Sequence, residues 1–254
     1  MTKFVFFDLD GTLTDPFEGI TGSILYALGK MGRELPERDS LRSFIGPPLI
    51  PSFRTFLGMT QAEAERALGL YREYYAEHGL FENRVYPGIP ALLDRLKRAG
   101  RILCLATSKP ETFARRILEH FSLDGYFREI CGATLDGSRE TKGEVLKELV
   151  RRLSAARAFP NASRVSGPVR KNVSARPDPK RFRSVPPLPE TKLSPALSEE
   201  VLSAAVMIGD RKHDAEGARE IGIPTVGVLW GYGSREELDG AGCVKLAESP
   251  EELV

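Results

Sequence analysis

The stretch of residues 4–12 constrains the fold of this chain more than any other segment. Four apolar residues, 4–7, stand between a lysine and a carboxylate, which is the pattern of a short buried strand. Asp8 and Asp10 follow where that strand ends, and Gly11 permits a tight turn of the backbone. Buried carboxylates are costly unless they are paired or bind a cation. The pattern predicts a metal site, a proton-transfer pair or both, although it also fits a strand followed by a solvated acidic turn.

Two further polar clusters follow apolar runs of the same strand type. Thr107 and Ser108 follow the run 102–106, and Asp210 follows the run 204–208. Strand patterns alternate with helical patterns around these clusters, which is typical of a parallel sheet covered by helices on both faces. Ligands bind beyond the carboxyl ends of the strands in such sheets. The sequence therefore predicts an α/β fold, a Rossmann-like doubly wound parallel sheet, with the three polar clusters at one edge.

Residues 15–85 interrupt this alternation of strands and helices. Apolar residues recur at near-helical spacing over 16–31 and 61–79, and no strand pattern lies between them. We therefore expect a separate all-helical unit, inserted after the first strand. The catalytic α/β core would then consist of residues 1–14 and 86–254.

Residues 154–200 differ in composition from the rest of the chain. They contain eight of the 18 prolines, and Lys and Arg exceed Asp and Glu by seven between Arg151 and Glu200. They show no apolar periodicity, and X-Pro bonds disfavour helix. We expect a disordered or polyproline-like insertion within the core. It is interpreted as a solvated insertion, with a nucleic-acid-binding or partner-binding arm as the alternative.

Charge and cysteine content narrow the class of protein further. The formal net charge of +1 gives no argument for binding to nucleic acid or to a membrane surface, and no apolar run approaches the length of a membrane span. The chain starts without a signal-peptide pattern. Cys104, Cys131 and Cys243 are scattered and lack metal-binding spacing, which fits a reducing compartment. We therefore expect a cytoplasmic protein.

The acidic motif at residues 8–12 belongs to a set of four. Asp-Leu-Asp-Gly-Thr resembles the first motif of the haloacid-dehalogenase-like (HAD) phosphatases. Thr107, Lys142 and the Gly-Asp-Arg-Lys-His-Asp run at 209–214 resemble the second, third and fourth motifs of that family, in the family's order. The first and fourth motifs are specific, whereas the second and third carry weight through their order.

The resemblance implies a phosphoric monoester hydrolase that uses Mg²⁺ and an aspartyl-phosphate intermediate. It assigns nucleophilic attack to Asp8 and proton transfer to Asp10, and it gives Asp214 a water-mediated role at the metal. Two alternatives stay open: Asp214 as a simple acid at a helix N-terminus, and Thr107 as a hydroxyl that caps the helix after Pro110. The implied site residues are Asp8, Asp10, Thr107 and Lys142 for catalysis, Asp8, Gly11, Thr107, Ser108 and Lys142 for phosphate binding, and Asp8, Asp10, Asp210 and Asp214 for the metal.

The helical insertion bears on the substrate. Its position resembles that of a helical cap, and its segments 44–48 and 52–54 resemble the cap of the phosphoglycolate-phosphatase-like group. This resemblance implies a small phosphorylated metabolite as substrate, with Arg54 either facing a substrate anion or lying on the surface. The alternatives are a nucleoside 5′-monophosphatase and, in another class, a non-catalytic binding or regulatory protein that uses the basic insertion. We expect a monomer or homodimer that binds no membrane and no nucleic acid, although the basic insertion leaves nucleic acid open.

The insertion generates a testable prediction. The helix that begins at Lys142 starts at the predicted site, so its far end and the start of the next strand lie at the opposite edge of the sheet. Lengthening such a loop costs little, about 0.6 kcal/mol for each doubling of its length. We expect that a short Gly/Ser linker in place of residues 156–196 leaves turnover and stability nearly unchanged and removes salt-sensitive binding to polyanions. A folded but inactive shortened protein would contradict this topology.

Overall fold

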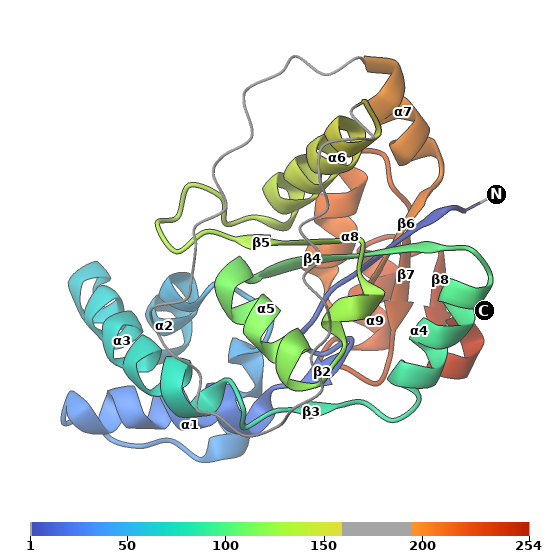
Figure 1. The fold of residues 1–254 in the computed structure, drawn as a ribbon. Coiled ribbons are helices and arrows are strands. Elements are labelled where there is room, and N and C mark those ends of the chain that lie inside the picture. The colour runs from blue at the N-terminus through green and yellow to red at the C-terminus, as the bar shows by residue number, and fades with distance from the viewer. Residues whose placement is uncertain (1, 159–194, 254) are drawn as a thin grey trace, which may run out of the picture.

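A parallel sheet forms the centre of the computed structural model, which describes residues 2–158 and 195–253 (Figure 1). The sheet has six strands in the order β5-β4-β1-β6-β7-β8. They are β1 (Phe4–Phe7), β4 (Ile102–Pro110), β5 (Glu129–Ala133), β6 (Ala205–Gly209), β7 (Thr225–Val228) and β8 (Lys245–Ala247). The chain moves from β1 to β4 on one side and later from β6 to β7 on the other, so β1 and β6 flank the switch point of the topology. The predicted α/β fold is confirmed.

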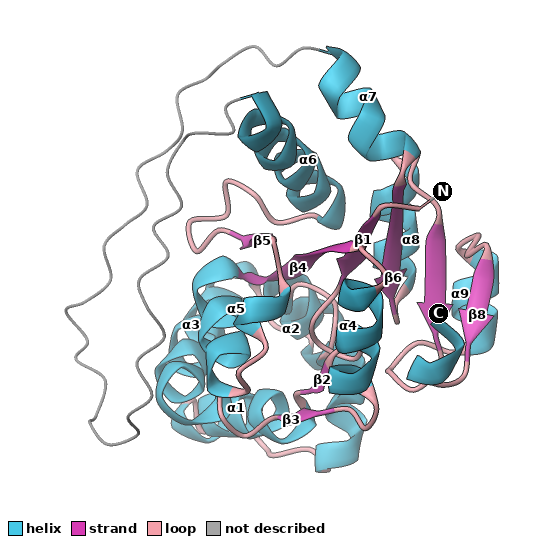
Figure 2. Ribbon diagram, turned by 45° about the vertical axis from the view of Figure 1, so that its right-hand side comes forward, coloured by secondary structure: helices cyan, strands magenta, loops and turns pink. Residues whose placement is uncertain are grey.

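Helices cover both faces of the sheet because successive side chains of β1 point to opposite faces. Phe4 and Phe6 pack in one apolar cluster with α6, α7 and α8, and Val5 and Phe7 pack in another with α4 and α5. Figure 2 shows α6 and α4 on opposite sides of the strands. The helices of this core are α4 (Ile89–Arg98), α5 (Glu111–His120), α6 (Lys142–Ala158), α7 (Pro195–Ser203), α8 (Lys212–Arg219) and α9 (Arg235–Gly240).

A group of helices between β1 and α4, which we call the helical unit, lies beside the sheet at the left of Figure 1. It consists of α1 (Phe17–Lys30), a 3₁₀ helix (Arg38–Phe44), α2 (Leu49–Leu57), α3 (Gln61–Tyr74) and a π-helical turn (Tyr75–Gly79). The start of α3 is fixed by Thr60, whose hydroxyl accepts a hydrogen bond from the backbone N–H of Glu63 while the Glu63 carboxylate accepts one from Thr60. Buried side chains such as Ile24, Phe53 and Tyr71 hold the helices together.

The two links to the helical unit pair with each other. β2 (Thr14–Asp15) runs antiparallel to β3 (Arg84–Val85), so the expectation that residues 15–85 are wholly helical is wrong at both ends. Two-residue strands are too short to show an alternating pattern. The buried carboxylate of Asp15 strengthens the pairing, since it accepts hydrogen bonds from the Arg84 guanidinium at 2.6 and 3.0 Å.

The proline-rich segment begins later and ends earlier than predicted. Residues 154–158 continue α6, and residues 195–200 belong to α7, so the expectation of an irregular 154–200 is wrong at its two ends. The physical reasons lie in the sequence: no proline occurs between Lys142 and Pro160, and Pro195 stands at the first position of its helix, where its missing N–H costs nothing. Residues 159–194, which carry the rest of the predicted insertion, lie outside the described residues.

Within 2–158 and 195–253, no helix combines the length and apolar character needed to span a bilayer.

Candidate active site

The predicted polar clusters meet where the strands of the sheet end. β1 lies between β4 and β6, and its Phe7 is in register with Leu105 of β4 and Ile208 of β6. Asp8 continues from β1 and donates its backbone N–H to the Ile208 carbonyl at 2.9 Å. Asp210 is the first residue after β6. The parallel register therefore brings segments some 200 residues apart in sequence to one edge.

Lys142 lies between two of the aspartates. Its Nζ is 2.8 Å from Asp8 Oδ1 and 2.8 Å from Asp214 Oδ1, and it donates a hydrogen bond to the Ala106 carbonyl at 2.9 Å. The ammonium is almost completely buried. Burial works against its charge, but the carboxylates of Asp214 and Asp8 outweigh that effect and raise the pKa of Lys142. This lysine is therefore a permanent positive charge beside Asp8.

The carboxylate of Asp210 is enclosed by backbone. It accepts hydrogen bonds from the Thr12 hydroxyl at 3.1 Å and from the backbone N–H of Tyr232 at 2.8 Å. A Cβ at Gly11 would lie 2.1 Å from Asp210 Oδ2, and one at Gly231 would lie 2.4 Å from it. Gly11 also has a φ of +84°, which side-chain-bearing residues rarely adopt. Both positions need glycine so that the carboxylate can fit.

Asp214 has the contact expected of an acid at a helix N-terminus, which was one of the two alternatives, and it also contacts Lys142. It lies in the first turn of α8, and its Oδ2 accepts a hydrogen bond from the backbone N–H of Arg211 at 3.1 Å, as an acid at a helix N-terminus does. Its Oδ1 faces Lys142. Burial raises the pKa of Asp214 to about 6, with Lys142 acting in the opposite direction.

The buried charges of the site do not balance. Asp8, Asp10, Asp210 and Asp214 are buried, and the nearby buried cations among the described residues are the ammonium groups of lysines 109 and 142. With all four carboxylates ionised, the two ammonium groups would leave a charge of −2. Burial, followed by the charges of Asp214 and Asp8, raises the pKa of Asp210, which shows how strongly these groups repel one another. Oxygens of Asp8, Asp210 and Asp214 lie within 4.8 Å of one another, so a divalent cation fits both the charge and the oxygen donors that Mg²⁺ prefers.

Lys109 is a site residue that sequence reasoning missed. Its Nζ lies 2.5 Å from Asp10 Oδ2 and donates a hydrogen bond to the Tyr75 hydroxyl at 2.6 Å. Burial raises the pKa of Asp10, and Lys109 acts against that rise. The position of Lys109 directly after Thr107 and Ser108 was the signal that could have drawn attention to it.

A cavity of about 440 Å³ opens between these loops and the helical unit. Thr107, Ser108 and Asp10 line its inner end, and Arg54 of α2 lines it from the helical unit. The Thr107 hydroxyl accepts a hydrogen bond from the Lys109 backbone N–H at 3.2 Å and shows no contact that would cap α5. The remaining lining is largely apolar and aromatic, with contributions from Phe44, Leu49, Ile50, Leu68, Tyr71, Tyr75 and Phe113.

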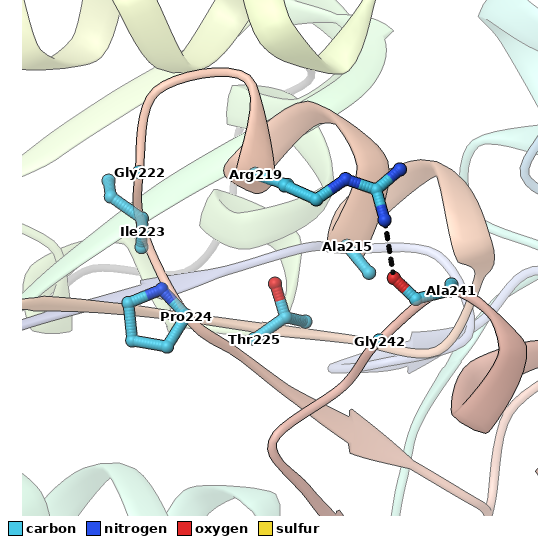
Figure 3. A pocket seen from close by; sticks show the side chains of 8 residues that line it. All are labelled: Ala215, Arg219, Gly222, Ile223, Pro224, Thr225, Ala241 and Gly242. Carbon is cyan, nitrogen blue, oxygen red and sulfur yellow. Dashed lines mark hydrogen bonds between the residues drawn. The ribbon is translucent and has the colours of Figure 1, made fainter.

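A second cavity of about 290 Å³ lies near the opposite edge of the sheet, at the start of β7 (Figure 3). Thr225, Pro224 and Gly242 are among the residues that line it. Arg219 reaches across it and donates a hydrogen bond to the Ala241 carbonyl at 3.2 Å. None of the described residues that line this cavity carries a carboxylate, so it does not share the chemistry of the first one.

Fold and site together define a class of proteins: α/β folds that hold an aspartate cluster and a buried lysine at the carboxyl edge of a parallel sheet. Within that class, the family model for haloacid dehalogenase-like hydrolases matches residues 5–158, and a second model, HAD-hydrolase-like, matches residues 190–251. The chain belongs to the haloacid dehalogenase-like hydrolase family. The resemblance seen in its four motifs is thereby confirmed.

Individual proteins similar to this chain carry different names. A 5′-nucleotidase from Pseudomonas aeruginosa is 39% identical over 236 residues, which is 92% of this chain and 86% of that protein. The tyrosine-protein kinase PtkA from Mycobacterium tuberculosis is 37% identical over 237 residues, 93% of this chain and 65% of the kinase. The crystal structure of a predicted phosphatase from Clostridium acetobutylicum superimposes with a TM-score of 0.77 at 37% identity and covers 100% of this chain and 96% of its own. The family, together with the relatives named 5′-nucleotidase and phosphatase, identifies the chain as a phosphoric monoester hydrolase.

The glycine enclosure around Asp210 generates a prediction. A Gly231→Ala substitution places a Cβ 2.4 Å from both the Asp210 side chain and the Gly11 carbonyl, so the loop must move. We expect a loss of unfolding free energy of about 1–3 kcal/mol in urea denaturation. Gly240→Ala is the matched control, because nothing lies within 4 Å of a Cβ there. Equal stability of the two variants would contradict the tight enclosure.

Proposed function

We propose that this protein is a Mg²⁺-dependent phosphatase that hydrolyses small phosphate monoesters through an aspartyl-phosphate intermediate. The observation that carries the proposal is the charge balance of the site: two buried lysines face four buried aspartates, whose ionised forms would carry an excess of negative charge that a divalent cation can offset. A charge-neutralising site suits a reaction in which an anionic nucleophile must approach an anionic phosphate.

The proposed chemistry has two steps. A carboxylate oxygen of Asp8 attacks phosphorus, the bond from phosphorus to the ester oxygen breaks, and Asp10 gives its proton to the departing oxygen. Asp10 then takes a proton from water, whose oxygen attacks the phosphorus of the aspartyl-phosphate and releases inorganic phosphate and Asp8. Lys142 remains beside Asp8 throughout and offsets the charge of the phosphoryl oxygens. Thr107 and Ser108 would supply a hydroxyl and a backbone N–H to the same oxygens.

The proposed metal ligands are the side chains of Asp8 and Asp210 together with the backbone carbonyl of Asp10. Asp214 would act on the metal through a water molecule. The proximity of Asp8, Asp210 and Asp214 and the uncompensated charge support this assignment. When bound, Mg²⁺ would stabilise negative charge on the phosphoryl group. Gly11 allows the chain to turn between Asp10 and Thr12, so that Thr12 can hold the Asp210 carboxylate.

The helical unit is proposed to act as a cap over the α/β core. In this division, residues 15–85 form the cap and residues 1–14 with 86–254 form the core. The cavity between the two parts supports a role in excluding water and selecting the leaving group. A monomeric or homodimeric state and a cytoplasmic location stay predictions.

A nucleoside 5′-monophosphate is the second candidate substrate. Two observations favour it over a small aliphatic phosphate: the 39% identity to a protein named 5′-nucleotidase, and a cavity of about 440 Å³ whose apolar and aromatic walls extend well beyond the reacting centre. A flat base would pack against such walls. Arg54 and Gln61, which also line the cavity, offer polar contacts within it.

Substitution of the proposed nucleophile tests the function. We expect Asp8→Asn to abolish turnover across a panel of phosphate esters with Mg²⁺, because an amide cannot attack phosphorus as a charged carboxylate does. Asp124→Asn, at an exposed aspartate, is the control and should match the parent. Turnover by Asp8→Asn within about tenfold of the parent would contradict the nucleophile assignment.

The same panel separates the candidate substrates. It contains phosphoglycolate, nucleoside 5′-monophosphates and phosphotyrosine, the last because one relative is named a tyrosine kinase. A higher kcat/KM for nucleotides than for phosphoglycolate would favour the nucleotidase function, and the reverse order would favour the small metabolite. No turnover of any ester would leave the non-catalytic alternative.

Removal of the metal gives a readout besides activity. We expect Mg²⁺ at about 100 times its Kd to raise the unfolding free energy of the parent by about 2.7 kcal/mol. The Asp210→Asn variant should gain much less, since it lacks one ligand charge. Calorimetry with and without Mg²⁺ measures the difference. Full turnover by the parent in excess chelator would remove Mg²⁺ from the mechanism.

A further inference from the structure

Lys109 and Lys142 are buried near each other but hold different carboxylates. Lys142 contacts Asp8 and Asp214, whereas Lys109 contacts Asp10. The charge of the proposed nucleophile and the position of the proposed proton donor are thus held by separate lysines. Lys109 therefore has a role that the motifs of the sequence do not describe.

Lys109 contacts one oxygen of Asp10 and leaves the other without a partner. Its Nζ is 2.5 Å from Asp10 Oδ2, while Asp10 Oδ1 is buried and has no hydrogen-bond partner among the described residues. A carboxylate fixed by one oxygen cannot rotate freely, so the other oxygen keeps a defined direction. Asp10 lines the cavity in which a phosphate ester would bind.

The other contact of Lys109 comes from the helical unit. Its Nζ donates a hydrogen bond to the Tyr75 hydroxyl at 2.6 Å and lies 4.8 Å from the centre of the Tyr75 ring. That ring stacks on Tyr71 of α3 at 5.2 Å and meets the edge of Phe113 of α5 at 5.6 Å. Tyr75 is thus held between helical unit and core, and it reaches Asp10 through a single side chain.

We propose that Lys109 is a positioning residue that aims the Asp10 carboxylate at the leaving-group oxygen, and that Tyr75 makes this position depend on closure of the helical unit over the site. The inference rests on the proposed phosphatase function. With the helical unit in place, Tyr75 and Asp10 together fix the ammonium group. When the helical unit moves away, Lys109 loses the Tyr75 contact and Asp10 loses its fixed orientation. Proton transfer is then efficient when the substrate is enclosed.

Lys109→Met tests the proposal because it removes the ammonium group and keeps a long apolar side chain. With an alkyl phosphate ester, we expect kcat to fall about tenfold or more with little change in KM, since the alkoxide must leave without a well-placed proton. With 4-nitrophenyl phosphate, the leaving group needs no proton, so its first turnover should stay fast. The later attack of water still needs Asp10. A rapid-mixing experiment should therefore show a burst of nitrophenolate that is larger than in the parent.

Tyr75→Phe provides the second variant, since it removes the hydroxyl and keeps the stacked ring. We expect kcat for the alkyl ester to fall about threefold, in the same direction as Lys109→Met. Tyr74→Phe is the matched control: the neighbouring tyrosine donates its hydroxyl to Glu82 at 2.8 Å, away from Lys109. This pair decides the question if Lys109→Met fails to fold.

The outcomes separate this inference from the proposed function. If the parent hydrolyses no ester with Mg²⁺, the phosphatase function fails and the inference fails with it. If the parent is active but Lys109→Met lowers the rates for both esters equally and gives no larger burst, the positioning role is wrong. If Tyr75→Phe behaves as Tyr74→Phe does, the dependence on closure is wrong.

Discussion

The burial of like charges is the constraint on which the rest of this structure depends. Four carboxylates lie at one edge of the sheet, where mutual repulsion and loss of water both act against their ionised forms. Lys142 joins Asp8 and Asp214 through one ammonium group, so a residue of α6 ties the loop after β1 to the start of α8. Removal of one member of such a buried pair leaves an uncompensated charge, which typically costs about 3–5 kcal/mol. The ion pairs of the site therefore also stabilise the core.

The loops that carry this chemistry also contact the helical unit. Arg211, next to Asp210, donates a hydrogen bond from its guanidinium to the Ile45 carbonyl, and Lys109 contacts Tyr75. Arg72 of α3 donates to the carbonyl of Leu135, in the loop after β5. Three separate segments of the core, the end of β4 and the loops after β5 and β6, thus touch the helical unit around the cavity. A movement of the helical unit would disturb loops next to Asp10 and Asp210, which couples access to the cavity with the geometry of the reacting groups.

Patterns that repeat along the chain predicted the sheet well. The apolar run Phe4–Phe7 predicted the central strand correctly. Both faces of β1 are covered by helices, and a strand buried on both faces has an uninterrupted apolar sequence. These sequence patterns did not predict elements that are very short or that depend on contacts between distant residues. The ribbon of β2 and β3 pairs residues about 70 positions apart, and two residues carry no periodicity. The helix from Pro195 was hidden by the surrounding prolines, although Pro195 itself is a start signal.

The candidate site likewise contains residues that the sequence predicted and one that it did not. Asp8, Asp10, Asp210 and Lys142 could be named in advance because they stand in ordered motifs, and the parallel register explains why those motifs meet. Lys109 could not be given a role, because its partner Tyr75 comes from a helix 34 residues earlier in the chain. That contact depends on how the helical unit lies against the core. No local pattern in the sequence records such a distance.

The buried charges also help to distinguish an enzyme from a non-catalytic binding protein with the same fold. A protein that only displayed a surface to a partner would gain stability if apolar residues replaced these buried ions, since a buried ion pair is often no better than a well-packed apolar group. Here Thr12, Gly11 and Gly231 enclose the Asp210 carboxylate in a place where burial raises its pKa. Groups kept in such an unfavourable state cluster at catalytic sites, because their reactivity comes from the same strain. The proposed divalent cation would offset the charge of these carboxylates and leave the site able to receive an anionic phosphate.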